Sequence, residues 1–439
     1  MSLLTFKKGV HPPSSKEATA AKPIERAPIP DTIIVPLSQH LGAPSKPVKS
    51  RGDEVTVGEQ LSEPASKISA GVHSPVAGKI KKLVDKPLPG GKMAQYVEIT
   101  VDHEATEAHE FERQDIDLSS LDRKTVTSRM REAGIVGMGG ATFPTDVKFS
   151  PPPTATLDTL IINGVECEPY LTCDHRLMLE NTRELLEGCR ALHAAYNFEA
   201  IYIGIESNKP DAVAAFENEA ASFADLPLRV VPLAVKYPQG AEKMLIKALT
   251  GRTVPMGGLP LEVGVIVSNV QTIFATYEAI FYNKPLIERV VTLSGAGVKN
   301  PKNVRAAVGT PLEHLVEFCD GISEDVDKVV VGGPMTGAAL PTLDYSVAKG
   351  TSGFLFFTDA DYTPEGPCIR CGRCVSACPM NLMPLKLAAY AKAEKFEDAK
   401  ALDASACFEC GSCAFGCPAK IDIVAWIRYA KNYIRVKGL

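Results

Sequence analysis

Eight cysteines near the end of the chain stand in two runs of identical spacing. The first run holds Cys368, Cys371, Cys374 and Cys378, and the second holds Cys407, Cys410, Cys413 and Cys417. Each run reads C-x-x-C-x-x-C-x-x-x-C-P, the spacing with which thiolates bind a pair of [4Fe–4S] clusters. Three cysteines at intervals of three residues can surround one face of a cubane cluster. The spacing therefore predicts that single electrons pass through this protein.

The fourth cysteine of each run is expected to bind the cluster that the other run holds, as in bacterial-type ferredoxins. One cluster would take Cys368, Cys371, Cys374 and Cys417, and the other would take Cys407, Cys410, Cys413 and Cys378. Gly372 and Gly411 allow tight loops, and Pro379 and Pro418 fix the chain direction after each run. Zinc sites or disulfides are the alternative, but a zinc site usually joins one C-x-x-C pair to a distant second pair.

The composition limits the class of protein. The chain has 439 residues, of which 45% are hydrophobic and 23% are charged, so it can form two to four domains with buried cores. A net charge of −5 does not favour nucleic acid as a partner. Cluster-binding thiolates require reduced cysteines, which indicates a reducing compartment such as the cytoplasm. We find no signal peptide and no run of about 18 apolar residues, which leaves peripheral membrane attachment open.

The N-terminal third is expected to precede the cofactor sites. Residues 1–30 are rich in proline and are predicted to be an extended arm, which could lie along a partner subunit, or a disordered tail. Short strands between turns follow, and "GDEVTVGEQL … VHSPVAGKIKKL" resembles the barrel-sandwich hybrid of lipoyl and biotinyl carrier domains. The hairpin with the modified lysine of those carriers is missing, so a structural or docking module is predicted. The acidic stretch 104–110 is expected to be a linker.

The middle of the chain alternates apolar strands and helices, which predicts an α/β layer architecture. We expect strands at 157–162, 200–205 and 263–267, and helices at 182–196, 210–223 and 241–250. Before them, three glycines within Gly137–Gly140 can bring the backbone close to a phosphate. Polar and acidic residues follow the first buried strand, where α/β sheets place their ligands.

Four of these segments together resemble the flavin- and NADH-binding subunit of respiratory complex I. They are "GIVGMGGATFPTDVK", "NGVECEP", "YPQGAEKMLIKALTGR" and "VSNVQT". Three further features, "FKKGVHPP", "NGVECEPYLTCDHRLM" and the paired cysteine runs after the α/β domain, resemble the C subunits of Rnf-type ferredoxin:NAD oxidoreductases more closely. The resemblance covers the chain from Phe6 to about Ile427. It implies a non-covalent FMN, an NAD(H) site and two [4Fe–4S] clusters.

The resemblance also implies which residues hold these groups, with no side chain as a covalent catalyst. FMN would contact Gly137, Gly139, Lys148, Asn163, Glu166, Gly240, Asn269 and Thr272, with Lys148 near its phosphate. NAD(H) would contact Gly140, Ala141, Phe143, Glu168, Tyr237 and Glu242. Two positions depart from the complex I pattern, because Val165 and Ala241 stand where that subunit has acids. Contacts at these two positions must differ.

The predicted fold class is multidomain α/β and α+β. We expect an arm at 1–30, a barrel-sandwich hybrid at 31–115, a Rossmann-like FMN/NADH domain at 116–285, an SLBB β-grasp domain at 286–362, a helical ferredoxin domain at 363–422 and a basic amphipathic helix at 423–439. This last helix could lie on a membrane or a partner, or pack with solvated lysines. Cys189 and Cys319 are expected in the core, and Cys167 as a packing residue.

The implied function is electron transfer between NAD(H) and one-electron carriers, with flavin as the converter between hydride and single-electron chemistry. The family places the chain on the cytoplasmic side of the cell membrane, among other subunits of an Rnf-type complex. Ferredoxin feeds that complex indirectly, and the energy drives sodium ions or protons. Two alternatives remain at this point. One is a soluble corrinoid reductase of the propanediol-utilisation type, and the other is a non-catalytic electron-wiring scaffold without flavin.

Overall fold

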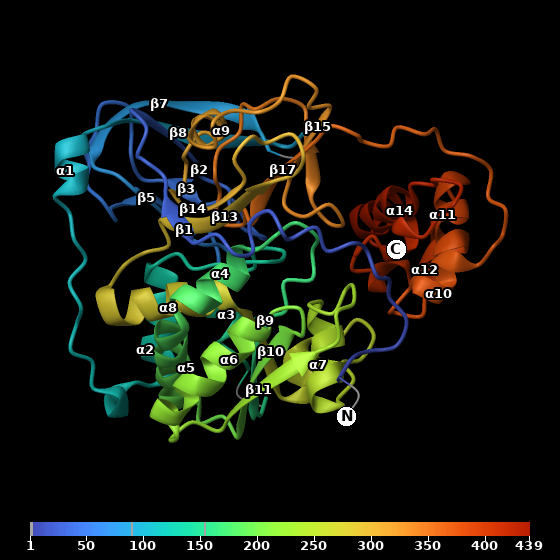
Figure 1. Cartoon of the computed structure of the whole chain (residues 1–439), viewed down its shortest axis with the longest axis horizontal. Helices are drawn as coiled ribbons and strands as arrows, with labels where there is room; N and C mark the ends of the chain where they lie inside the picture. The colour runs from blue at the N-terminus through green and yellow to red at the C-terminus, as the bar shows by residue number, and fades with distance from the viewer. Residues whose placement is uncertain (1–2, 89–90, 153–154) are drawn as a thin grey trace.

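A computed structural model describes residues 3–88, 91–152 and 155–439 of the chain (Figure 1). Two β-rich regions lie side by side above an α/β domain, and a small helical domain lies to one side. A long irregular segment connects this helical domain to the last strand of the β-rich part. The mixed multidomain architecture that the sequence predicts is therefore confirmed.

The barrel-sandwich hybrid consists of two antiparallel sheets around one core. Its four-stranded sheet has the order β2 (Thr32–Pro36), β8 (Met93–Val101), β7 (Gly78–Pro87) and β4 (Glu54–Val55). The smaller sheet has the order β3 (Lys46–Pro47), β5 (Gln60–Glu63) and β6 (Val72–His73). Alternate residues such as Ile33 and Val35 point inward and are fully buried, as the strand period requires.

The stretch after this domain is not the plain linker that the acidic sequence predicts. Its first half forms helix α1 (His103–Glu107), because the Asp102 carboxylate accepts a hydrogen bond from the Ala105 N–H at 3.0 Å. This N-cap satisfies one of the free amides of the first turn and makes the short helix possible. The linker predicted at 104–110 therefore begins with a short helix.

The α/β domain is built on a parallel sheet with the strand order β11-β10-β9-β12. The strands are β9 (Thr159–Gly164), β10 (Ala200–Glu206), β11 (Leu228–Leu233) and β12 (Val265–Asn269). The helices are α2 (Arg123–Glu132), α3 (Thr145–Lys148), α4 (Cys173–Glu180), α5 (Thr182–Tyr196), α6 (Pro210–Ala220), α7 (Glu242–Thr250) and α8 (Val270–Tyr282), with 3₁₀ turns at Leu118–Ser120, Ala221–Phe223 and Pro260–Val263. The chain order of the strands reverses between β9 and β12.

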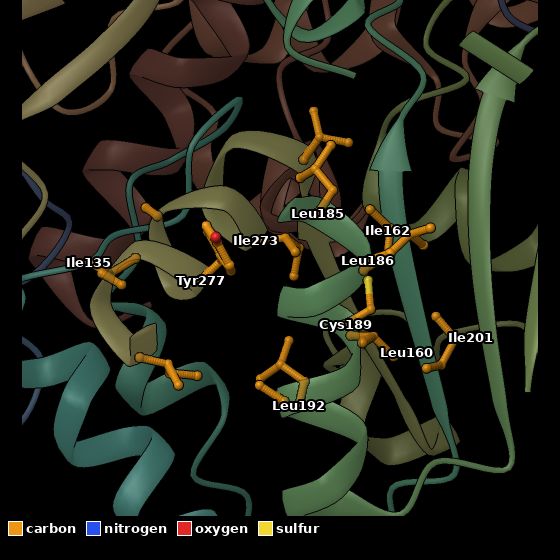
Figure 2. Packing of buried hydrophobic residues seen from close by; sticks show 14 of the residues in the cluster. Ile135, Leu160, Ile162, Leu185, Leu186, Cys189, Leu192, Ile201, Ile273 and Tyr277 are labelled. Atoms are coloured by element: carbon orange, nitrogen blue, oxygen red, sulfur yellow. The ribbon is translucent and has the colours of Figure 1, made fainter. Parts of the chain in front are cut away.

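Both faces of this sheet are covered, which explains the continuous apolar runs of its strands. Leu160 and Ile162 of β9 belong to a large core with helices α5 and α8, as Figure 2 shows. The intervening residue Ile161 points to the opposite face, where it packs with Leu245 of α7. Cys189 of α5 lies inside the larger core, so its predicted packing role is confirmed. Burial raises the pKa of its thiol to about 12.

The second β-rich unit is a six-stranded sheet that includes a strand from the N-terminal arm. Its order is β1 (Ile24–Arg26), β14 (Lys302–Ala307), β13 (Glu288–Ser294), β17 (Gly353–Phe357), β15 (Lys328–Val331) and β16 (Ala338–Leu340). Helix α9 (Leu312–Phe318) covers the core of this unit, and Cys319 at its end is fully buried, as predicted.

The rest of the arm lies along the other domains of its own chain. Leu4 pairs with Leu233 of β11, and Val10 pairs with Tyr237. Between these pairs, the Gly9 N–H donates to the Ala377 carbonyl at 3.1 Å in the helical domain. The arm thus contacts both the α/β domain and the helical domain, and its strand β1 then joins the sheet of the second β-rich unit.

The helical domain carries the cysteines. It contains α10 (Arg373–Ala377), α11 (Pro384–Lys392), α12 (Phe396–Ala401), α13 (Ser412–Phe415) and α14 (Ile423–Lys437), with a 3₁₀ turn at Ala404–Ala406. The apolar side of α14, which includes Ile427 and Ile434, is buried among α11 and α12. Among the residues that the structure describes, no helix is long and apolar enough to cross a membrane.

Candidate functional site

The eight cysteines of the two runs line two separate cavities. The outer cluster site is lined by Cys368, Cys371, Cys374 and Cys417. The inner cluster site is lined by Cys378, Cys407, Cys410 and Cys413. Each cavity therefore combines three cysteines of one run with the fourth cysteine of the other. Four thiols around one cavity suit a [4Fe–4S] cluster, because each iron of the cubane takes one thiolate.

The two cluster sites differ in the exposure of their cysteines. Cys368 and Cys371 of the outer site are exposed, and Ile369 between them is 66% exposed. The inner site has no exposed cysteine in the described structure, since Cys378 and Cys413 are buried and the other two are half-buried. Two ligands of the outer site therefore face solvent, while those of the inner site are at least partly covered by protein.

The inner site touches the α/β domain directly. The Tyr237 hydroxyl donates to the Cys410 carbonyl at 2.8 Å. The next residue, Gly411, has a positive φ of 81°, and a Cβ there would lie 2.6 Å from the Met335 carbonyl of the six-stranded unit. Only glycine fits both the backbone conformation and this close approach. The ligand loop of the inner site is thus fixed between two domains.

Polar residues gather at the carboxyl edge of the α/β sheet, where the strand order reverses. Asn163 is the last residue but one of β9, Asn269 is the last residue of β12, and the two residues are direct neighbours in the parallel register. Ligands of open α/β sheets bind in the crevice at such a reversal. Helix α8 begins at the same edge, where the Asn269 side chain accepts from the Gln271 N–H, so the positive end of the helix dipole points there.

The glycine-rich loop covers this edge. Gly137 N–H donates to the Phe143 carbonyl at 2.8 Å, which closes the loop, and Met138 N–H donates to Thr272 Oγ1 at 2.9 Å. Gly139 has a positive φ of 76°, and a Cβ there would lie 2.9 Å from Asn269 Nδ2. The loop therefore approaches the strand edge as closely as its backbone allows. Gly140 and Ala141 at its tip are exposed and can meet a ligand.

The start of α7 adjoins the same edge of the sheet. Lys148 Nζ lies 2.6 Å from Glu242 Oε1, and both side chains are about one-third exposed, at 32% and 37%. Asn163 Nδ2 donates to the Gly240 carbonyl at 2.9 Å. An accessible ammonium, exposed loop amides and a helix N-terminus at one edge suit the phosphate of FMN. The residues that the resemblance implies for FMN are thus brought together, with one exception.

That exception is Glu166, whose carboxylate is turned into the protein. It accepts from the backbone N–H groups of Asp174 at 2.7 Å and His175 at 3.4 Å, at the start of α4. Lys16 Nζ of the arm lies 3.8 Å away. Burial raises the pKa of Glu166 to about 7, although the Lys16 ammonium acts in the opposite direction. Glu166 therefore ties the loop after β9 to α4, and its contact with flavin stays a prediction.

Glu168 and Tyr237 lie on the side of the crevice that adjoins the inner cluster site. The Glu168 carboxylate accepts from the Met335 N–H at 3.0 Å and from the Thr336 hydroxyl, and it lies 3.4 Å from the Tyr237 hydroxyl. Burial raises the pKa of Glu168. The two residues connect the α/β domain, the six-stranded unit and the inner site. Their predicted contacts with a nucleotide are not tested by this geometry.

The two positions that depart from the complex I pattern are filled by apolar packing. Val165 is fully buried, and a Cβ at Gly240 would lie 3.4 Å from its Cβ. Ala241 precedes the first residue of α7 as its cap. Cys167 accepts from the Gly240 N–H at 3.4 Å, and burial raises the pKa of its thiol. The loops after β9 and before α7 therefore pack directly against each other.

Three polar residues that support this site were missed from the sequence. Asp174 accepts from Asn269 Nδ2 at 2.6 Å and orients its amide. Buried Lys209 donates to the Val165 carbonyl at 2.8 Å, and Lys16 donates to the Glu168 carbonyl at 2.9 Å. Asp174 stands within the segment "NGVECEPYLTCDHRLM", so that motif was the available signal. Lys16 and Lys209 lie in stretches without a recognisable pattern.

Four family models match the chain in the order of its domains. They are the RnfC barrel sandwich hybrid domain at residues 4–104, the Nuo51 FMN-binding domain at 130–278, the SLBB domain at 290–339 and the 4Fe-4S dicluster domain at 367–421. Among solved structures, an NAD+-reducing [NiFe]-hydrogenase in the H2-reduced state is similar in fold. Its TM-score is 0.50 at 20% identity, over 74% of this chain and 68% of that chain.

Curated relatives match over nearly the full length. The C subunit of the proton-translocating ferredoxin:NAD(+) oxidoreductase complex of Clostridium ljungdahlii is 45% identical over 99% of this chain and 95% of its own length. The C subunit of the Na(+)-translocating complex of Acetobacterium woodii is 40% identical over 98% and 97%. The C subunit of the ion-translocating oxidoreductase complex of Rhodobacter capsulatus is 38% identical over 89% and 76%. The chain therefore belongs to the family of C subunits of ion-translocating ferredoxin:NAD(+) oxidoreductase complexes.

Proposed function

We propose that this chain is the subunit that exchanges electrons with NAD(H) in an ion-translocating ferredoxin:NAD+ oxidoreductase complex. Support comes from the names of its full-length relatives and from the matches to an FMN-binding domain and a 4Fe-4S dicluster domain. When bound, FMN would exchange a hydride with the nicotinamide, and the two clusters would carry single electrons. The residues of this chain bind these groups, orient them and exclude water between them.

The cluster ligands are proposed as the two sets that line the two cavities. Cys378, Cys407, Cys410 and Cys413 would hold the inner cluster, and Cys368, Cys371, Cys374 and Cys417 the outer one. The small loop residues Gly372 and Gly411 have positive φ angles of 75° and 81°, which aim backbone N–H groups toward the cavities. Such donors stabilise the charge on cluster sulfurs.

The FMN residues are proposed as the set that meets at the carboxyl edge of the sheet. Lys148 would pair with the phosphate, and Asn163, Asn269 and Thr272 would orient the loops around the ring. Gly137, Gly139, Gly240 and Glu166 complete the proposed set. The nucleotide residues are proposed as Gly140, Ala141, Phe143, Glu168, Tyr237 and Glu242. Phe143 is half-buried at the end of the glycine-rich loop, from which its ring could stack on a base.

One observation carries this proposal: the hydrogen bond from the Tyr237 hydroxyl to the Cys410 carbonyl. Tyr237 belongs to the same loop as Gly240 in the proposed flavin pocket, and Cys410 belongs to the inner cluster site. A continuous protein contact therefore connects the pocket to the enclosed cluster, and the exposed outer cluster remains for exchange with a partner. The proposed order of carriers is NAD(H), FMN, inner cluster, outer cluster and then other subunits.

We place the chain at the cytoplasmic face of the membrane as a peripheral subunit. Support comes from relatives that are subunits of ion-translocating complexes and from thiolate sites that require a reducing compartment. The two relatives named first differ in the ion that their names give, proton in one and sodium in the other. The features that this chain shares with both relatives therefore do not determine the coupling ion.

The test is an anaerobic titration of the protein, loaded with FMN and clusters, with NADH. Visible absorbance follows the flavin, and low-temperature EPR follows the reduced clusters. Bleaching of the flavin together with a cluster signal is the expected result. Bleached flavin with silent clusters would mean that their potentials lie below that of NADH, which suits electron flow toward NAD+. Absence of bleaching with intact clusters would overturn the proposal in favour of a wiring scaffold.

A further inference from the structure

Two basic side chains of helix α14 bind the ligand loop of the inner cluster site. Lys431 Nζ donates to the Cys407 carbonyl at 2.7 Å and to Glu409 Oε1 at 2.5 Å. Arg428 Nε donates to Glu409 Oε2 at 2.7 Å. Glu409 stands between the ligands Cys407 and Cys410, so both cations act on the loop that surrounds the cluster.

The balance of charge on this loop is positive. Glu409 and the two cations of α14 together leave one net positive charge on this loop. The Glu168 carboxylate lies outside this group, next to the Tyr237 hydroxyl. Lys431 is 24% exposed and Glu409 is 25% exposed, whereas Arg428 is 55% exposed. Solvent and salt screen the exposed guanidinium more strongly than the half-buried ammonium. Lys431 is therefore the cation that the inner cluster experiences most directly.

The outer site lacks this arrangement. The residue that corresponds to Glu409 in the first run is Arg370, which is exposed. The residue that corresponds to the buried Ser412 is Arg373, which is also exposed. The Ser412 hydroxyl lies 3.4 Å from the Cys410 sulfur, so the inner site has a close polar partner on a ligand. The two sites thus share their ligands but differ in the charges and donors around them.

We propose that Lys431 raises the reduction potential of the inner cluster above the value that its enclosed site would otherwise give. Reduction adds one negative charge to the cluster, and a fixed, partly desolvated cation on the ligand loop stabilises that charge. Glu409 has the opposite effect and also holds Lys431 in place. Lys431 is therefore a tuning residue that contacts a ligand loop and takes no part in hydride transfer. This inference rests on the proposed function only in that both require the two clusters.

The test is a redox titration with dithionite and mediators, followed by EPR, on the protein with both clusters. Lys431→Gln removes the ammonium but can keep a hydrogen bond to the Cys407 carbonyl, and Lys431→Arg keeps the charge. Arg435→Gln is the matched control, because Arg435 lies one turn further along α14. In the described structure its side chain donates a hydrogen bond to Asn432 and none to the ligand loop. Signals are assigned to each cluster with Cys378→Ser and Cys417→Ser.

Lys431→Gln is expected to shift the midpoint potential of the inner cluster to more negative values and to leave the outer one unchanged. Lys431→Arg should restore most of the shift, and Arg435→Gln should cause none. Glu409→Gln should shift the same cluster in the positive direction. A role in loop geometry alone would shift the inner cluster in the same direction in Lys431→Gln and Glu409→Gln. That result, or an unchanged potential in a Lys431→Gln variant that keeps the cluster, overturns the proposal.

If the Lys431→Gln variant loses the inner cluster, the potential of that cluster in the Glu409→Gln variant tests the proposal instead. A positive shift supports the proposal, and a negative shift or none overturns it. Because dithionite is the reductant, these outcomes do not depend on NADH. A failure of NADH to bleach the flavin would count against the proposed function, whereas unchanged potentials in the Lys431 and Glu409 variants would count only against the tuning role.

Discussion

The two cysteine runs are nearly identical in spacing, yet their sites occupy different environments. The inner site lies against Tyr237 and the Met335 carbonyl, and its cysteines are buried or half-buried. The outer site opens to solvent at Cys368 and Cys371. Identical ligand spacing predicts the same cluster type for both sites, while the surrounding domains determine which site adjoins the α/β domain. The position of a site within the molecule, and not its motif, therefore distinguishes the two sites in the proposed relay.

The largest effect is expected from the shared ligands. Cys378→Ser should remove the inner cluster and Cys417→Ser the outer one, so that iron falls from about eight to about four per chain in each variant. In each variant the substituted cysteine belongs to one run, whereas the other three ligands of the lost cluster belong to the other run. EPR of the two variants should show complementary single signals, and buried Cys319→Ala is the control with full iron. If Cys378→Ser instead removes the signal that Cys374→Ser removes, each run holds its own cluster and the contrast between the two sites fails.

Removal of the flavin anchor comes next. Lys148→Ala should weaken FMN binding about 10- to 100-fold, because a hydrogen bond to a charged group contributes roughly 1.5–3 kcal/mol. FMN retention after gel filtration and fluorescence titration measure the change. Iron content and reduction of both clusters by dithionite should stay unchanged, since Lys148 belongs to α3 of the α/β domain and not to the cluster domain. Lys247→Ala, at an exposed position of α7, is the control, and equal FMN loss in both variants would show that the pocket is misplaced.

A smaller effect is expected from loss of the hydrogen bond between Tyr237 and the inner site. Tyr237→Phe removes the hydroxyl that donates to the Cys410 carbonyl, a loss of about 1 kcal/mol for a neutral hydrogen bond. Reduction of the inner cluster by NADH in stopped-flow experiments should slow several-fold, roughly the fivefold that 1 kcal/mol represents. Tyr202→Phe, whose hydroxyl accepts a hydrogen bond from Arg229 of the neighbouring strand β11, should have no such effect. Equal rates for wild type and Tyr237→Phe would mean that this contact does not support the relay.

The smallest effect on the clusters is expected from a lysine that joins three domains. Lys349 Nζ donates to the carbonyls of Gly71 and Gly134 at 2.6 Å each, and the side chain is 1% exposed. Burial lowers the pKa of Lys349 to about 7 from its ordinary value of 10.5. Between these two pH values the Lys349 side chain is protonated in the unfolded chain but not in the folded chain. The contribution of Lys349 to the free energy of unfolding therefore increases with pH over this range.

Lys349→Met should therefore lower the unfolding temperature more at pH 9 than at pH 7 under anaerobic conditions. The variant leaves two carbonyls without a donor, which costs about 1–3 kcal/mol. Both cluster signals should keep their potentials, because Lys349 lies outside the cluster domain. A loss of stability that is larger at pH 7 would contradict this direction of the pH effect. A shifted inner-cluster potential would show that the two regions are less independent than their separate contacts indicate.

Local patterns carried most of what could be predicted from the sequence. The helix predicted at 182–196 has the bounds of α5, and the strand predicted at 200–205 extends only one residue further as β10. The periodicity of apolar residues determines such elements, and this periodicity is visible within a short window of sequence. The grouping of cysteines across the two runs follows from a repeat of the same kind.

Contacts between distant segments could not be predicted in this way. Asp174 orients Asn269, and Lys16 of the arm donates to the loop after β9, but neither pair shares a local pattern. The basic residues of α14 show the same limit. The sequence suggested a membrane, a partner or solvent for them, whereas Arg428 and Lys431 bind Glu409 within the chain. The tertiary fold determines which residues become these partners, and a short stretch of sequence carries no information about it.

The N-terminal arm has a consequence for how the chain is made. Lys8 donates to the carbonyl of Val375, 367 residues further along, which at common rates of synthesis leaves the ribosome roughly 20–70 s later. The arm can therefore pair with Leu233 and Tyr237 of the α/β domain before the first cysteine run has emerged. Its contacts through Lys8 and Gly9 form only after α10 has folded. These two contacts are thus among the last to form, and they join the first domains of the chain to the last one.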